Sequence, residues 1–277
     1  MEDASLEALA AMSEELARHG VTSFCPTVMA RPIEGLPPIL DMIRAGQRQG
    51  LSGAYVHGAR LEGPYLSPLK KGAQKESCLS KPDAGEFLAL WNRYPGLIKI
   101  VDLAPELEGA EDFIRRVRSR CVISMAHTAA SYEGALEAFR QGVGQATHLF
   151  NGMAALGHRE PGPAGAVLDS EQVRAELICD GIHIHPAMLR LAFRILGSRA
   201  VVVSDSMRAA GMPDGEYTLG GQKVCVRQGT ASITGWHLGG IHYESAPGAA
   251  KSAEVWDSSG AGGKSDDFKS GGSAWRG

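Results

Sequence analysis

The segment CVISMAHTAASYEGALEAFRQGVGQATHLFN, residues 121–151, contains the unit from which the fold is built. Apolar and β-branched side chains at its start predict a strand over 121–126, and a second run of this kind predicts a strand over 145–149. The residues between them predict a helix over 132–141. Strands that alternate with helices in this way indicate a parallel sheet.

The same alternation extends from this segment toward both ends of the chain. Further strands are predicted over 21–28, 53–61, 97–103, 174–179 and 200–203, and further helices over 6–19, 39–49, 85–94, 109–118 and 186–196. Closed parallel sheets of this type have eight strands, whereas this chain has seven and begins with a helix. The expected fold class is therefore α/β, a (β/α)8 TIM-type barrel without its first strand, which would lie before Met1.

The last part of the chain differs in composition from the rest. Residues 231–277 number 47 and include 10 glycines and 8 serines, with few large apolar side chains. Such a segment buries too little apolar surface to offset the entropy lost on ordering. We therefore expect an incomplete barrel domain over 1–230 and a poorly ordered tail over 231–277. The connection over 65–81 has no periodic element and follows a strand, which is typical of a functional loop.

Charge and cysteine content exclude several classes of protein. The chain of 277 residues has 28 basic and 31 acidic side chains, and its net charge of −3 argues against binding to nucleic acid or to a membrane surface. The five cysteines are widely spaced without a CxxC pair, so neither a disulfide framework nor a thiolate zinc site is expected. Because no secretory signal is recognised and no apolar run reaches the roughly 20 residues of a membrane span, we expect a cytoplasmic protein.

Four polar residues lie where predicted strands end, namely Glu62, His127, His148 and Asp205. Two imidazoles and a carboxylate can hold a divalent metal, and a further carboxylate beside it can move protons. Each residue taken singly is more often a structural hydrogen-bonding group or a cap. Because the carboxyl ends of barrel strands meet at one rim, their joint placement favours a catalytic site over four unrelated structural roles.

Six short segments of the chain resemble one known family. They are RLEGPY (60–65), AHT (126–128), THLFN (147–151), REPG (159–162), DGIH (180–183) and SD (204–205). Together they are similar to the N-acetylglucosamine-6-phosphate deacetylases of the amidohydrolase superfamily, with a likeness that runs from about residue 6 to residue 230. The family normally has a further first strand, often with a His-x-His pair, and a small β-sandwich built from both termini, and neither is recognised in this sequence.

The resemblance implies a role for each matching residue. Glu62, His127 and His148 would hold a catalytic divalent metal, zinc or iron, and Asp205 would act as the general base and then as the acid. The substrate-binding residues would be Asn151, Arg159, His183 and Gln74. Asn151 and His183 would contact the sugar phosphate, and Arg159 would reach the phosphate across the interface of a homodimer. Gln74 stands where many members have a histidine that assists the substrate carbonyl.

The expected activity is metal-dependent hydrolysis of N-acetylglucosamine 6-phosphate to glucosamine 6-phosphate and acetate, in amino-sugar catabolism. Two alternatives remain open from the sequence. One is another amidohydrolase, such as a dihydroorotase-like enzyme or a deaminase, which has no evident need for Arg159 as a phosphate anchor. The other is an inactive fragment that keeps these residues without holding them rigidly. Arg60 is a further departure, because histidine is frequent at this position in the family.

Overall fold

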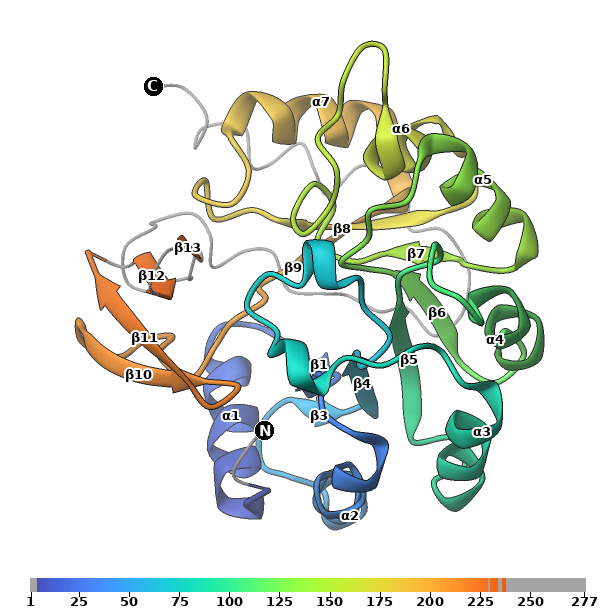
Figure 1. Cartoon of the computed structure of the whole chain (residues 1–277). Coiled ribbons are helices and arrows are strands. Elements are labelled where there is room, and N and C mark those ends of the chain that lie inside the picture. Colours follow the sequence, from blue (N-terminus) through green and yellow to red (C-terminus); the bar gives the residue numbers. More distant parts are fainter. Residues whose placement is uncertain (1–3, 229, 234–235, 238–277) are drawn as a thin grey trace.

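A computed structural model describes residues 4–228, 230–233 and 236–237, and its main element is a parallel sheet of seven strands. The strands lie side by side in chain order and are β2 (Thr27–Met29), β4 (Ala59–Glu62), β5 (Ile98–Leu103), β6 (Val122–Met125), β7 (Gln145–Ala146), β8 (Arg174–Ile178) and β9 (Ala200–Val203). All six pairings are parallel. The sheet curls around a central space with helices on its outer side (Figure 1), which confirms the predicted open barrel.

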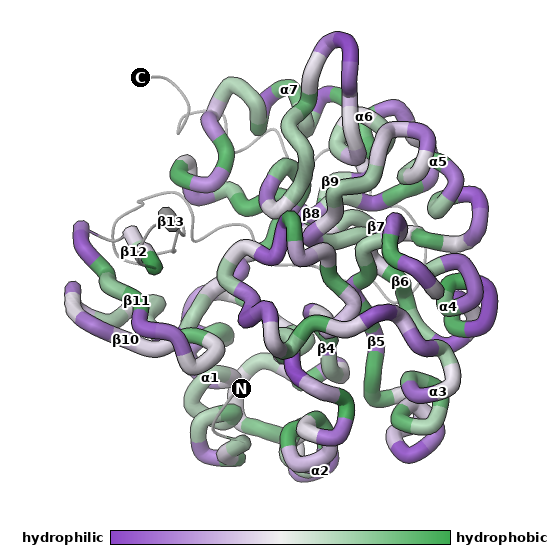
Figure 2. The backbone as a smooth tube through the Cα atoms, in the orientation of Figure 1, coloured by the Kyte–Doolittle hydropathy of each residue, from purple (hydrophilic) through white to green (hydrophobic). Residues whose placement is uncertain are grey.

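Helices follow the strands and cover the outside of the sheet. They are α1 (Leu6–Arg18), α2 (Pro37–Gln49), α3 (Ala84–Arg93), α4 (Ala110–Val117), α5 (Tyr132–Gln141), α6 (Gly162–Asp169) and α7 (Pro186–Leu196). The side chains of Ser5, Asp83 and Ser131 accept a backbone N–H in the first turns of α1, α3 and α5, as N-caps do. Helix α4 buries an apolar stripe and carries hydrophilic segments on its outer side (Figure 2), so its position against the sheet follows from amphipathicity.

Two predicted strands are each divided in the structure. The run over 21–28 forms β1 (Ser23–Phe24) and then β2, with Cys25 and Pro26 between them. Proline has no N–H to donate to a ladder, which explains the interruption. Likewise, the run over 53–61 forms β3 (Tyr55–Val56) and β4. Strands β1 and β3 pair with each other in a separate two-stranded sheet.

The helix α6 was missed by the sequence analysis. Its residues, GPAGAVLD, begin with Gly162 and Pro163, which are ordinarily turn formers. Proline is nevertheless tolerated in the first turn of a helix, where its absent N–H would have no helical partner. The helix is almost wholly buried, so packing against its neighbours, including α5 and α7, stabilises it despite its low intrinsic propensity.

A second sheet, also unpredicted, lies beyond the parallel strands. It is antiparallel and consists of β10 (Gly215–Leu219), β11 (Gln222–Arg227), β12 (Thr230–Ile233) and β13 (Trp236–His237). The predicted start of the tail, at residue 231, is therefore placed too early, because residues 231–233 and 236–237 belong to strands. The rest of that expected tail lies outside the described residues. Gln222 Nε2 donates to the carbonyl of Ala73 at 2.6 Å, which ties this sheet to the connection over 65–81.

The connection over 65–81 and the ends of the parallel sheet surround the central space. As predicted, this connection has no long element and contains the short 3-10 turns Pro68–Lys70 and Glu76–Cys78. Within the described part of the chain, β2 and β9 each have one edge without a strand partner. Residues of both strands line a cavity of about 1500 Å³ inside the curl. The break in strand pairing between these two edges is called the seam below. None of the helices described is long and apolar enough to cross a membrane.

Candidate metal centre

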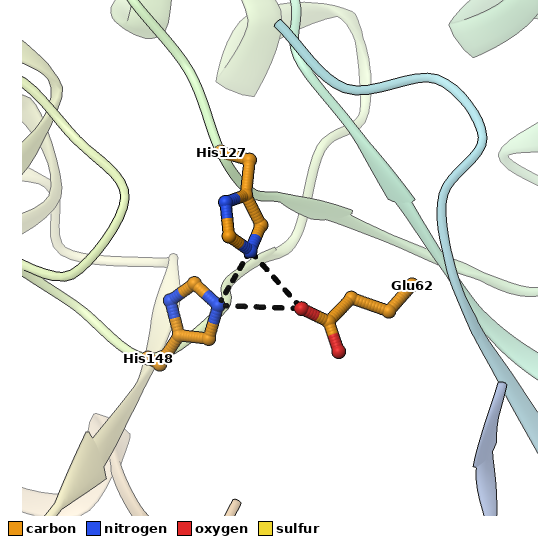
Figure 3. A group of neighbouring side chains, drawn as sticks. All are labelled: Glu62, His127 and His148. Carbon is orange, nitrogen blue, oxygen red and sulfur yellow. Dashed lines mark hydrogen bonds and ion pairs between the residues drawn. The ribbon is translucent and has the colours of Figure 1, made fainter. Parts of the chain in front are cut away.

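Three strands bring Glu62, His127 and His148 together at the carboxyl end of the sheet. Glu62 is the last residue of β4, and each histidine follows the last residue of β6 or β7 by two positions. His127 Nε2 lies 3.0 Å from Glu62 Oε1 and 3.2 Å from His148 Nε2, and His148 Nε2 lies 3.7 Å from Glu62 Oε1 (Figure 3). All three side chains are largely buried and line the central cavity. We call them the Glu62 cluster.

The backbone at this rim is strained. His127, His148 and Asp205 have φ values of 42°, 30° and 48°, in the left-handed region that residues with a Cβ seldom occupy. Each such residue costs about 1–3 kcal/mol and persists only where the surrounding structure imposes it. In all three cases the chain turns sharply just past a parallel strand. The strained turn therefore directs the side chain over the end of the sheet.

The chemistry of the three donor atoms fits a divalent metal. His127 Nδ1 lies 2.8 Å from the carbonyl oxygen of Lys70, which can only accept, so the ring proton belongs on Nδ1. His127 Nε2 then presents a lone pair to the carboxylate of Glu62, and two acceptors repel each other unless a cation or a proton lies between them. An outer carbonyl that fixes the tautomer of a histidine is the usual companion of a metal ligand. The ligand atoms of all three residues lie within 4.8 Å of one another.

Electrostatics at the cluster favour opposite charges on its members. Burial raises the pKa of Glu62, but the adjacent imidazoles of His127 and His148 outweigh this effect and hold the pKa well below its usual value. Burial lowers the pKa of His148, whereas the nearby carboxylate of Glu62, together with the charge of Asp205, raises it to about 9. The pocket therefore stabilises a negative carboxylate together with a nearby positive charge.

Asp205 lies on the same rim, two residues beyond β9, and lines the cavity. Desolvation by the surrounding atoms and the negative charge of Glu62 raise its pKa, while the charge of His148 lowers it. The net direction is upward, so this carboxyl binds a proton more readily than an ordinary aspartate does. A carboxyl with a raised pKa beside a cationic centre is suited to accepting and returning a proton.

The other expected site residues are distributed unevenly. Asn151, His183 and Gln74 all line the cavity. Asn151 donates to the carbonyl of His148, and His183 Nδ1 lies 2.6 Å from Asp180 Oδ2. Gln74 is buried, and its Oε1 accepts the backbone N–H of Ala30 at 3.0 Å. Arg159 lies on the exposed loop before α6, away from the residues that line the cavity.

Sequence reasoning did not predict a buried ionic network beneath the cluster. Arg60 makes hydrogen bonds to Asp102, Glu176 and Thr147 inside the curl of the sheet, and we call these four residues the Arg60 network. Burial and the neighbouring Glu62 and Glu176 raise the pKa of Asp102 to about 6, against the lowering effect of Arg60. The signal available in the sequence was the charge of Arg60, Asp102 and Glu176 beside apolar residues within strands β4, β5 and β8.

Gly152 provides a test of this geometry. Its φ is +61°, and a Cβ at this position would lie 2.7 Å from His127 Nδ1. We expect Gly152→Ala to displace the His127 ring from the Lys70 carbonyl and to weaken metal binding roughly 10-fold or more, as loss of an outer hydrogen bond does. Calorimetric titration with Zn²⁺ measures this.

The control is Gly144→Ala, because no atom lies within 4 Å of the Cβ that it would add. This variant is expected to bind metal as the unaltered chain does. Equal affinities for all three proteins would contradict the contact between Gly152 and the His127 ring.

Fold and site together define a class of protein. A curled parallel sheet with outer helices, and a cluster of two histidines and a glutamate at the carboxyl ends of its strands, is the architecture of α/β-barrel enzymes with a catalytic metal site. A comparison with profiles of known protein families gives no match. Comparison with individual proteins shows which enzymes the chain resembles.

The chain is 39% identical over 243 residues to the N-acetylglucosamine-6-phosphate deacetylase of Bacillus subtilis (strain 168), an alignment that covers 86% of this chain and 61% of the relative. It is 37% identical to the N-acetylgalactosamine-6-phosphate deacetylase of Escherichia coli O157:H7, over 87% of this chain and 64% of the relative. The crystal structure of the N-acetylglucosamine-6-phosphate deacetylase from Pasteurella multocida superposes with a TM-score of 0.80 at 31% identity, over 87% of this chain and 63% of that one.

By sequence and by fold, the chain is similar to N-acetylglucosamine-6-phosphate deacetylases, which confirms the resemblance described above. The chain spans about three fifths of the length of these relatives.

Proposed function

We propose that this protein hydrolyses the acetamide of an N-acetylhexosamine 6-phosphate, releasing acetate and the amino sugar phosphate. N-acetylglucosamine 6-phosphate is the first candidate substrate. The observation that carries the proposal is the convergence of Glu62, His127 and His148 near the carboxylate of Asp205 in a chain that is similar to these deacetylases. The names of the relatives support this substrate class, because one is a deacetylase of N-acetylglucosamine 6-phosphate and another of N-acetylgalactosamine 6-phosphate.

The roles of the residues follow from their positions. Glu62, His127 and His148 would hold a divalent metal, for which we propose zinc or iron. When bound, such a metal lowers the pKa of a water molecule toward about 7 and polarises the carbonyl of the acetamide. Asp205 takes the proton of the attacking water and then returns it to the departing nitrogen, because an amine leaves poorly unless it is protonated.

The substrate contacts are part of the same proposal. His183 and Asn151 line the cavity and would contact the sugar phosphate. Gln74 also lines the cavity, and the carbonyl of its neighbour Ala73 accepts a hydrogen bond from Gln222 in the β10–β11 sheet. Arg159 is exposed on its loop and would meet the phosphate from across a homodimer. Its planar guanidinium can donate two parallel hydrogen bonds to phosphate oxygens. We place this activity in cytoplasmic amino-sugar catabolism.

The test measures acetate release from three sugars by the purified chain, together with its metal content. We expect acetate release from N-acetylglucosamine 6-phosphate. The rate with N-acetylgalactosamine 6-phosphate, which differs at C4, measures the selectivity for the configuration at that carbon. Unphosphorylated N-acetylglucosamine is the third substrate and should react much more slowly. Equal turnover with and without the phosphate would favour another amidohydrolase activity. A metal-free protein that unfolds without cooperativity would identify an inactive fragment.

A further inference from the structure

The Arg60 network lies directly under the Glu62 cluster and has no part in the chemistry proposed above. Arg60 is 8% exposed, and its two acidic partners, Asp102 and Glu176, are 0% and 3% exposed. Arg60 Nε and Nη2 lie 3.1–3.2 Å from the oxygens of Asp102, and Nη1 lies 2.6 Å from Glu176 Oε1. One guanidinium therefore links β4, β5 and β8 across the inside of the sheet.

Glu176 connects this network to the strained turn at His148. Its Oε2 accepts the backbone N–H of His148 at 3.4 Å, and its own carbonyl accepts the N–H of Leu149 at 2.7 Å. Gln145 Nε2 also donates to Glu176 Oε1, at 2.6 Å. The carboxylate that holds His148 is thus fixed by Arg60 on one side and by a neighbouring strand on the other.

Thr147 gives a second connection to the same turn. Its Oγ1 accepts from Arg60 Nη2 at 2.7 Å and donates to Asp102 Oδ1 at 3.1 Å. The residue before His148 and the N–H of His148 itself are therefore both held by groups that Arg60 binds. A backbone at φ 30° needs such support, because a relaxed turn would rotate the imidazole away from its neighbours.

We propose that Arg60 is a positioning residue, which acts through Glu176 and Thr147 to hold the turn at His148 so that His148 Nε2 stays directed at His127 and Glu62. The proposal rests on the proposed function, since it takes His148 to be a metal ligand. Without the guanidinium, two carboxylates would remain buried and facing each other without a cation. Their repulsion would move Glu176 away from the N–H of His148, because uncompensated buried charges are strongly unfavourable.

The test uses Co²⁺, whose visible absorption reports the geometry of its ligands, with the full-length chain. Arg60→Met keeps an unbranched side chain, which is shorter than that of arginine, and removes the charge and the donors. We expect this variant to bind Co²⁺ roughly 10–100-fold more weakly and with an altered spectrum, as changes behind a metal ligand do. The control is Arg140→Met, since Arg140 is an exposed arginine that pairs with Glu137 on the surface of α5. This control should keep both the affinity and the spectrum.

A double-mutant cycle distinguishes positioning from a merely structural role. Glu176→Gln, which keeps the shape of the side chain, is expected to weaken Co²⁺ binding in the same direction. The double variant with Arg60→Met should bind Co²⁺ no more than roughly twofold more weakly than the weaker-binding single variant. The effects of two residues that act through the same series of contacts do not add. Arg60→Lys keeps the charge without the planar fork and should restore part of the affinity. If Arg60→Met does not fold, Glu176→Gln and Arg60→Lys carry the test.

Three results would overturn the proposal. If the unaltered chain binds Co²⁺ but the variants bind it with unchanged affinity and spectrum, showing only a lower melting temperature, the network is structural and this inference alone fails. Fully additive losses from Arg60 and Glu176 would also contradict it, because Arg60 would then act by another route. If the unaltered chain binds no Co²⁺, the proposed function fails and the inference fails with it.

Discussion

Asp205→Asn is expected to stop acetate release while leaving the metal bound. The carboxyl acts twice in the proposed reaction, as the base toward water and as the acid toward the departing nitrogen, and an amide side chain can do neither. General acid–base groups each contribute about 100- to 10,000-fold to a rate, so we expect a loss of at least about 1,000-fold in kcat. The measurement is acetate release at saturating substrate, combined with elemental analysis of the same preparation.

The control for Asp205→Asn is Asp112→Asn on the surface of α4. Asp112 pairs with Arg115 and Arg116 and is half-exposed, so its replacement should leave both activity and metal content unchanged. Unchanged acetate release by Asp205→Asn would remove this residue from its assigned role. Loss of the metal along with the activity would instead make Asp205 a part of the metal site.

His127→Asn is expected to remove the metal and the activity together. His127 lies in the middle of the cluster, within 3.2 Å of both other members, and its Nδ1 is fixed by the Lys70 carbonyl. Removal of a ligand itself should weaken metal binding by more than the roughly 10- to 100-fold that the loss of an outer partner costs. Zn²⁺ content after dialysis and the rate of acetate release should both fall nearly to background.

Chelation of the unaltered chain provides the comparison for His127→Asn. Treatment with a chelator should stop acetate release, and added Zn²⁺ should restore it in the unaltered chain but not in the variant. His158→Asn, at an exposed position before α6, should behave as the unaltered chain does. A chelated protein that keeps its full rate would contradict the metal-dependent reaction.

The order of strands and helices was predictable because each obeys a simple period. The strand around 121–126 and the helix over 132–141 are found where the apolar spacing places them, whereas only residues 145–146 of the run over 145–149 form a strand. Helix α6 was not predictable from its Gly-Pro start, because burial rather than propensity stabilises it. Strands β10 and β11 alternate between more and less buried residues, but they were missed because only one side of their sheet packs, on a small core.

The candidate site was predictable in its residues but not in its support. Glu62, His127 and His148 follow or end apolar strands, and parallel strands bring such positions to one rim. Arg60 and Glu176 are 116 residues apart in the sequence, and a charge inside a strand gives no indication of its partner. The strained turns at the histidines were equally hidden, because positive φ values arise from tertiary constraints rather than from local preference.

The seam between β2 and β9 has a consequence for the network beneath the metal site. Arg60 and Glu176 line the cavity that β2 and β9 border, so water in this cavity can raise the local dielectric constant around them. Attraction between charges weakens in proportion to the dielectric constant. A segment or partner that covers the seam would exclude water from this interior and strengthen the interactions by which Arg60 positions the turn at His148. Metal affinity would then rise as the sheet becomes more fully enclosed.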